Sequence, residues 1–214
     1  ASGKEGTKIV PDLAESIPKP TGGGKIWTFK LRPGIKFSDG SPLTGKDVKA
    51  TFNRIFKIGD SPNAGSWYNV IQGADACLKT PKTCDLSGIT VNGDTVTFHL
   101  TEADPEFLDK LSVPFAFILP ASTPAHNLSI PPAGTGPYMW KTYAPTKQIV
   151  LVRNPHFKEW SAEAQPSGNP DQIVQKFGLT PEAQVTAVEN NTADWMFDQP
   201  PADRLGELST KYAD

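Results

Sequence analysis

Apolar and polar residues alternate over residues 27–32, where Trp27, Phe29 and Leu31 are separated by polar positions. A period of two places the apolar side chains on one face of an extended chain and therefore predicts a β-strand. Pro33-Gly34 ends this pattern, because proline has no amide hydrogen for a sheet and glycine accepts a positive φ.

The period then changes to that of a helix. Asp39-Gly40 predicts a turn, and Thr44 stands three residues before Asp47, the spacing of a variant capping box. The apolar positions that follow have the i, i+4, i+7, i+8 spacing of one helix face; they are Val48, Phe52, Ile55 and Phe56. We therefore expect an amphipathic helix that begins after Thr44.

Weaker patterns predict the rest of the chain. Asn92-Gly93 predicts a hairpin over residues 89–100, with Val96, Phe98 and Leu100 on one face. Further strands are expected from Tyr138 and over residues 149–153 and 173–179, and short helices over 105–111, after Thr180 and over 201–209. Residues 59–65 and 114–132 are expected to form loops.

Composition limits the possible functions. The chain has 214 residues, 21 of them proline, and a net charge of −2. Nucleic-acid binders need a basic face, so a nucleic-acid partner is not expected. No apolar run of about 18 residues is present to predict a membrane span, and the polar start of the chain does not resemble a signal peptide.

Catalytic motifs receive little support. Residues 40–46 (GSPLTGK) fit the spacing of a phosphate-binding loop, but Pro42 removes an amide donor and Asp47 stands where such a loop needs Ser or Thr. The three histidines, His99, His126 and His156, are far apart and in no recognised motif. A pair of carboxylates acting as in a glycosidase stays open, so a hydrolase is kept as a weak alternative.

The literal residues of the first strand, turn and helix resemble the bacterial extracellular solute-binding proteins of family 5, the peptide- and nickel-binding class of ABC importers. The matching positions are Lys30, Leu31, Arg32, Gly34, Lys36, Phe37, Asp39, Gly40, Pro42, Leu43, Asp47, Val48, Phe52 and Arg54. Residues 134–138 (GTGPY) and 153–160 (RNPHFKEW) resemble two further family segments, which we expect to be structural.

The resemblance implies an α/β fold of the class II periplasmic-binding-protein type with mixed sheets. It also implies three parts: an incomplete start of the main lobe (1–40), a small α/β subdomain of lobe I (41–135) and a return to lobe I (136–214). The family's first strands and whole second lobe are not expected within this sequence. We therefore expect open strand edges, some self-association and weak peptide affinity of the chain by itself.

As implied by the resemblance, the chain is part of a carrier and not an enzyme. It would capture short peptides, or a related solute, outside the cell and deliver them to a membrane permease, without a cofactor or metal. An exported location follows, in the periplasm or as a cell-surface lipoprotein. A structural or adhesive surface module is the alternative, although it does not account for the two long motif matches.

The resemblance also selects candidate ligand-binding residues. Phe197, Asp198 and Gln199 follow a family segment whose next strand runs along the ligand cleft, and Asp198 could pair with a peptide amine. Trp67 and Tyr68 are weaker candidates, because aromatic residues at such a position are also ordinary core residues.

Cys77 and Cys84 have six residues between them, in a segment expected to be a loop. In an exported protein such a pair predicts a disulfide, whereas in a reducing compartment both would be free thiols. Zinc is not expected, because the spacing is not C-x-x-C and no histidine is near.

Overall fold

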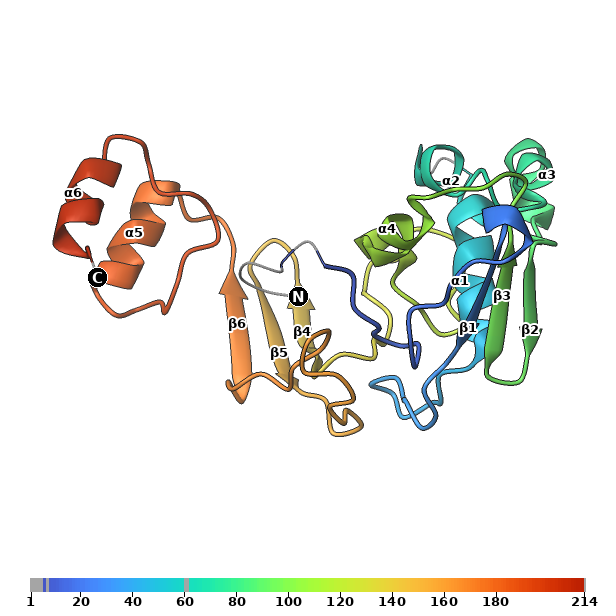
Figure 1. Ribbon diagram of the computed structural model, residues 1–214. Helices are drawn as coiled ribbons and strands as arrows, with labels where there is room; N and C mark the ends of the chain where they lie inside the picture. The colour runs from blue at the N-terminus through green and yellow to red at the C-terminus, as the bar shows by residue number, and fades with distance from the viewer. Residues whose placement is uncertain (1–5, 7, 60–61, 214) are drawn as a thin grey trace. The chain divides into compact units, whose positions relative to one another are not determined.

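The computed structural model describes residue 6 and residues 8–59 and 62–213. These residues form two compact units (Figure 1). Unit 1 contains the residues up to Trp140 together with Val152–Asp171, and unit 2 contains Lys141–Leu151 together with the residues from Gln172 onward. The division into 1–40, 41–135 and 136–214, which refers to lobes of a larger protein, stays a prediction.

A three-stranded sheet organises unit 1. Its order is β1 (Ile26–Lys30), β3 (Thr95–His99), β2 (Ile89–Asn92), and both pairings are antiparallel. The hairpin turn falls at the predicted place, with Gly93 at a φ of 58°. The predicted face is also confirmed, because Val96, Phe98 and Leu100 are almost fully buried.

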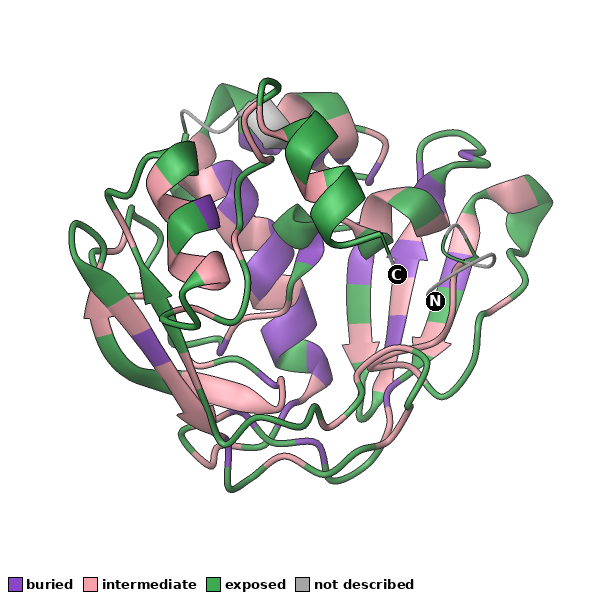
Figure 2. Ribbon diagram, turned by 90° about the vertical axis from the view of Figure 1, so that its left-hand side faces the viewer, coloured by how far each residue is buried: buried purple, intermediate pink, exposed green. Residues whose placement is uncertain are grey.

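Helix α1 (Gly45–Lys57) supplies the other half of the core. All four apolar positions of its predicted face are buried, and Phe52 packs edge-on against Tyr68 and Phe98 at ring-centroid distances of 5.1 and 5.2 Å. Burial is concentrated in unit 1, whereas unit 2 is mostly exposed or partly exposed (Figure 2). The apolar faces predicted for the strands and for α1 are thus buried in the same core.

The capping box predicted from Thr44 and Asp47 is present, with both of its reciprocal contacts. The Asp47 carboxylate accepts hydrogen bonds from the Thr44 amide (2.7 Å) and from the Thr44 hydroxyl (2.8 Å). The Thr44 hydroxyl in turn faces the Asp47 amide, and that amide also donates to the Thr44 carbonyl at 3.1 Å. The other Asp47 oxygen accepts from the Ala121 amide at 2.7 Å, so this buried carboxylate also fixes the proline-rich segment.

Two helices of unit 1 were not predicted. Helix α2 (Pro62–Trp67) occupies most of the expected loop at 59–65, of which Asp60 and Ser61 lie outside the described residues. Helix α3 (Ala74–Lys79) and the 3-10 helix η3 (Pro81–Thr83) replace the loop expected around the cysteines. Each has six residues or fewer, which is too short for an apolar period to show in the sequence.

The remaining elements of unit 1 are short. Near the N-terminus lies the 3-10 helix η2 (Gly22–Gly24), and α4 (Phe107–Ser112) is followed by the 3-10 helix η4 (Pro114–Ala116). Helix α4 confirms the helix predicted near 105–111. The segment after η4 is irregular up to β4, as expected from its prolines.

The two other motif segments meet in unit 1. Buried Asn154 donates from its side chain to the Gly136 carbonyl and from its amide to the Pro137 carbonyl, both at 2.8 Å. Arg153 donates to the carbonyls of Ser167, Gly168 and Asn169. These contacts give GTGPY and RNP the structural role that was expected.

A second three-stranded sheet has the order β4 (Tyr138–Ala144), β5 (Gln148–Arg153), β6 (Gln172–Lys176). Helices α5 (Pro181–Glu189) and α6 (Leu205–Lys211) follow. Thr180 caps α5 as predicted, because its hydroxyl accepts from the Ala183 amide at 3.3 Å. The last helix exists as predicted but begins four residues later than expected, after Arg204.

Candidate functional site

The candidate segment, residues 193–199, lies in the connection between α5 and α6 of unit 2. It leaves α5 by a tight turn, with Asn191 at a φ of 55° and the amides of Thr192 and Ala193 both donating to the Ala187 carbonyl. The strand that the resemblance implied after Asp194 is wrong for this structure, because 195–199 is irregular. Its side chains are therefore presented by a loop.

Two aromatic residues dominate this loop. Phe197 is 74% exposed and Trp195 is 64% exposed, and their ring centroids are 6.0 Å apart. Sequence reasoning selected Phe197 but missed Trp195, although the i, i+2 spacing of the two rings was visible. Two adjacent exposed rings form a small apolar surface, which is available for contact with a ligand.

Polar groups adjoin the rings. One oxygen of Asp198 accepts a hydrogen bond from the Gln184 side chain at 2.6 Å, and the same Gln184 nitrogen donates to the Leu179 carbonyl at 3.1 Å. Asp198 is exposed and Gln199 is exposed beside it. The loop therefore offers two rings, a carboxylate and an amide, which can contact the apolar and polar parts of a peptide.

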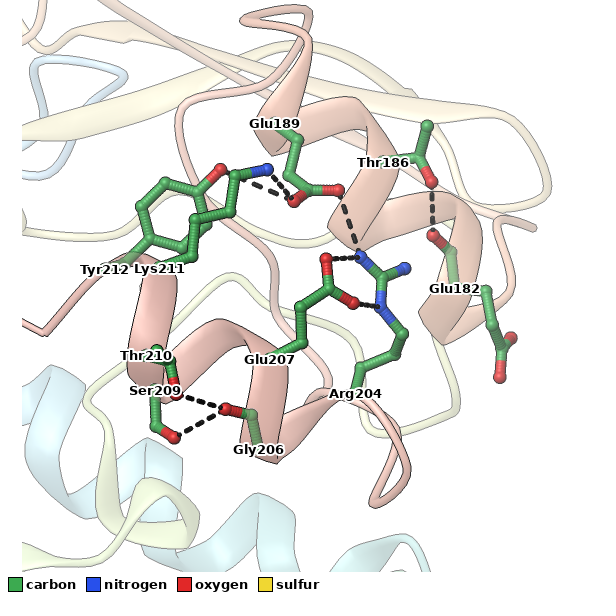
Figure 3. A network of polar contacts seen from close by, with 10 residues as sticks. All are labelled: Glu182, Thr186, Glu189, Arg204, Gly206, Glu207, Ser209, Thr210, Lys211 and Tyr212. Atoms are coloured by element: carbon green, nitrogen blue, oxygen red, sulfur yellow. Dashed lines mark hydrogen bonds and ion pairs between the residues drawn. The ribbon is translucent and has the colours of Figure 1, made fainter.

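A charged network joins α6 to α5 (Figure 3). The two oxygens of Glu189 accept from Lys211 at 3.0 Å and from Arg204 at 3.2 Å, and Arg204 also pairs with Glu207 at 3.0 Å. Hydrogen bonding by Lys211, and then by Arg204, lowers the pKa of Glu189 below its ordinary value. Because the loop of residues 193–199 is anchored at both ends by these helices, the network helps to position it.

The other candidates, Trp67 and Tyr68, belong to unit 1. Tyr68 is fully buried, and its hydroxyl donates to the Lys110 carbonyl at 2.8 Å. Burial raises the pKa of Tyr68 to about 12. We therefore interpret Tyr68 as a core residue, whereas Trp67 is half-buried with its ring 5.6 Å from that of Phe115.

The predicted disulfide between Cys77 and Cys84 is present, and both residues are buried. It closes the turn from α3 to η3. The next residue, Asp85, pairs with Lys49 at 3.0 Å and accepts from Asn53 at 3.0 Å, both on α1. The Lys49 and Asn53 hydrogen bonds lower the pKa of Asp85. The disulfide thus fixes a segment that packs on the central helix.

Among the described residues, no three histidine, cysteine, aspartate or glutamate side chains are grouped as a metal site would need. Within the same part of the chain, none of the helices combines the length and the apolar character of a membrane span.

Comparison with known proteins places this chain in a family. A profile described as "Bacterial extracellular solute-binding proteins, family 5 Middle" matches residues 8–213. The probable D,D-dipeptide-binding periplasmic protein DdpA of Escherichia coli K12 is 35% identical over 162 residues, which are 72% of this chain and 28% of that protein. Di/tripeptide-binding protein 4 of Pseudomonas aeruginosa is 30% identical over 202 residues, 85% of this chain and 35% of that protein.

Solved structures agree at the level of the fold. Haemophilus influenzae OppA in complex with the peptide RPPGFSPFR superposes with a TM-score of 0.76 at 19% identity, over 96% of this chain and 40% of that one. The α/β class II periplasmic-binding-protein fold is thereby confirmed. The chain spans about a third of the length of the curated relatives it matches, and it belongs to the bacterial extracellular solute-binding proteins of family 5.

Proposed function

We propose that this chain is part of the substrate-binding component of an ABC importer that captures short peptides outside the cell and delivers them to a membrane permease. The observation that carries the proposal is the family match over residues 8–213. The names of the relatives support peptide as the solute, since DdpA is named for dipeptides and its Pseudomonas relative for di- and tripeptides. The protein performs no chemistry and works outside the cytoplasm, in the periplasm or as a cell-surface lipoprotein.

Within the chain, we propose the loop of residues 193–199 as the part that touches the solute. The exposed rings of Phe197 and Trp195 supply apolar area at a small cost in side-chain entropy. Asp198 and Gln199 supply acceptors for peptide amides or an N-terminal amine. Trp67 is retained as a weaker contact, and Tyr68 is assigned to the core because it is fully buried.

Native mass spectrometry of the complete gene product, purified without added solute, tests the proposal. A ladder of bound masses that fit short peptides is the expected result. A single bound mass that fits hexose units would instead indicate that the protein carries a sugar. A protein without bound mass, and without binding in a peptide and sugar screen, would contradict a carrier function and favour the structural-module alternative.

Variants of the same gene product test the loop. Phe197→Ala and Asp198→Asn are expected to reduce the bound-peptide fraction about tenfold each, which is the effect of losing one good contact. Leu205→Ala is the matched control, because Leu205 is 51% exposed in the same unit and outside the loop. Equal retention in all three variants would show that peptides bind elsewhere.

A further inference from the structure

Unit 1 contains a pocket that none of the candidate ligand-binding residues lines. It lies between α1 and the segment around η4, and its volume is about 340 Å³, within the range of roughly 300–1,000 Å³ usual for small-molecule sites. Ile55, Ile58, Phe115 and Phe117 supply apolar walls, and Arg54 brings a positive charge. The pocket therefore combines apolar area with one cation.

Among the residues that the structure describes, Arg54 has no anionic partner. Arg54 donates from Nε to the Pro124 carbonyl and from Nη2 to the His126 carbonyl, both at 2.8 Å. Across the part of the chain that the structure describes, no carboxylate lies within 4.0 Å of this guanidinium. Since a guanidinium has five N–H donors, neutral carbonyls use only part of its capacity. A carboxylate is the group that this geometry favours.

Contacts made by the lining residues hold two parts of the pocket wall in place. The Thr51 hydroxyl accepts from the Leu119 amide at 2.9 Å and fixes the chain beyond Phe117. The Trp67 ring packs edge-on against Phe115 at 5.6 Å. Phe117 itself is 64% exposed, so one apolar wall is open for contact with a ligand. These two contacts hold part of the wall in place before a ligand arrives, which reduces the cost of binding.

We propose that this pocket binds a small amphipathic carboxylate, with the apolar chain against Phe117, Ile55 and Ile58 and the carboxylate on Arg54. The charge complementarity favours this occupant over an uncharged apolar molecule. The site uses none of the residues of the 193–199 loop. It is therefore separate from the loop proposed to touch the peptide, and the weaker peptide candidate Trp67 contacts its wall but does not line it.

Titration calorimetry of the 214-residue chain with octanoate and octanamide tests the proposal. The two probes have the same apolar chain and differ in charge. Octanoate is expected to bind about tenfold more tightly, as one charge-assisted contact predicts. Arg54→Gln is expected to reduce octanoate affinity to that of octanamide and to leave octanamide unchanged.

Phe117→Ser provides a second variant, because an exposed ring can be removed without unfolding unit 1. It is expected to weaken both probes about fivefold. Two controls are matched to the variants: Lys57→Gln removes a charge from the same helix, and Ile130→Ser removes a side chain that is 65% exposed. Neither residue lines the pocket, and neither change is expected to alter binding.

Three results would overturn the proposal. The first is equal affinity for octanoate and octanamide, which would mean unspecific apolar contact. The second is a loss of probe affinity in the control variants that is as large as the loss in Arg54→Gln and Phe117→Ser. The third is light scattering that shows a dimer of the wild-type chain and a monomer of Phe117→Ser, because the pocket would then be an interface between two copies.

Discussion

The two units are built in different ways. Unit 1 has a continuous apolar core to which β1, β2, β3, α1, α2, α3, α4 and η4 contribute. In unit 2, the described residues classed as buried are Val150 and Val185. Its two helices are joined by the ion pairs of Glu189, and the rings of Trp195 and Phe197 are exposed. In this chain, the unit with the strong local sequence patterns is also the unit with the stable apolar core.

The physical reason lies in the energies involved. Burial of a large apolar side chain contributes about 1.5–3 kcal/mol, whereas an exposed ion pair contributes between about 0 and 1 kcal/mol. Unit 1 contains many buried apolar side chains, whereas unit 2 relies mainly on ion pairs. We therefore expect unit 2 to open locally at a lower free energy than unit 1.

The largest expected effect comes from two single variants, in each of which alanine replaces one phenylalanine, the first in unit 1 and the second in unit 2. Phe52 is 1% exposed in unit 1 and Phe197 is 74% exposed in unit 2. Phe52→Ala is expected to reduce the free energy of unfolding by about 3–5 kcal/mol, because it leaves a cavity in the core. Phe197→Ala is expected to change it by less than about 0.5 kcal/mol. Urea unfolding followed by circular dichroism measures both, and similar losses would refute the contrast.

Removal of the disulfide should affect unit 1 alone. In the chain-entropy model, Cys77→Ala with Cys84→Ala reduces the free energy of unfolding by about 2.5 kcal/mol. Hydrogen exchange should accelerate in α1 and β3 and stay unchanged in α5. Reduction of the wild-type chain is the control and should reproduce the effect. Faster exchange in α5 would show that the stability of unit 2 depends on unit 1.

The capping box predicts an unequal pair of variants. Asp47→Ala removes the acceptor of the Thr44 and Ala121 amides, and should reduce the free energy of unfolding by about 2 kcal/mol. Thr44→Ala removes the hydroxyl that forms the other half of the box, and should reduce it by about 1 kcal/mol, the typical value for a cap. Thermal unfolding measures both, and the reverse order would mean that the Thr44 hydroxyl is the more important half of the box.

The smallest expected effect is a faster amide exchange of α6, in unit 2, at acid pH. The pKa of Glu189 lies below its ordinary value in the folded chain, so its ion pairs stabilise α6 above the ordinary carboxyl pKa. This contribution is lost as the pH falls through the lower folded value. Amide exchange in α6, corrected for intrinsic rates, should therefore accelerate relative to α1 below about pH 4.

Two variants sharpen this test. Glu189→Gln should make α6 exchange fast at neutral pH and largely remove its acid dependence. Glu182→Gln is the matched control on the same helix, because the Glu182 side chain forms none of the ion pairs of the described residues. An unchanged α6 in Glu189→Gln would show that apolar contacts, and not charge, hold this helix.

Several features follow from local patterns and were predicted. The alternation in β1, the Asn92-Gly93 turn and the helical period of α1 each extend over enough residues to specify an element. The disulfide followed from the resemblance together with the spacing of the two cysteines. Helices α2 and α3 could not be predicted in this way, because six residues do not show a period and only their packing against α1 selects the helical state.

For the candidate site too, the sequence selected some residues, and only the structure showed which of them are exposed. Trp67 and Tyr68 are neighbours in the sequence, yet Tyr68 is buried and Trp67 is half-buried, because adjacent positions at the end of a helix face different directions. Phe197 and Asp198 were selected for a strand that is absent, and their exposure on a loop, together with Trp195, became visible only in the structure. The pocket at Arg54 combines residues from 51 to 119, which no local pattern connects.

The sequence by itself therefore determined the family, the α/β class, the cysteine pair and the longest periodic elements, since these depend on residues close together along the chain. The tertiary structure alone decided which aromatic residues are buried, how Asp47 shares its two oxygens, and that Arg54 lies in an apolar pocket without a carboxylate. Those features depend on contacts between residues far apart in sequence, and the free energy of such contacts is not encoded in any single segment.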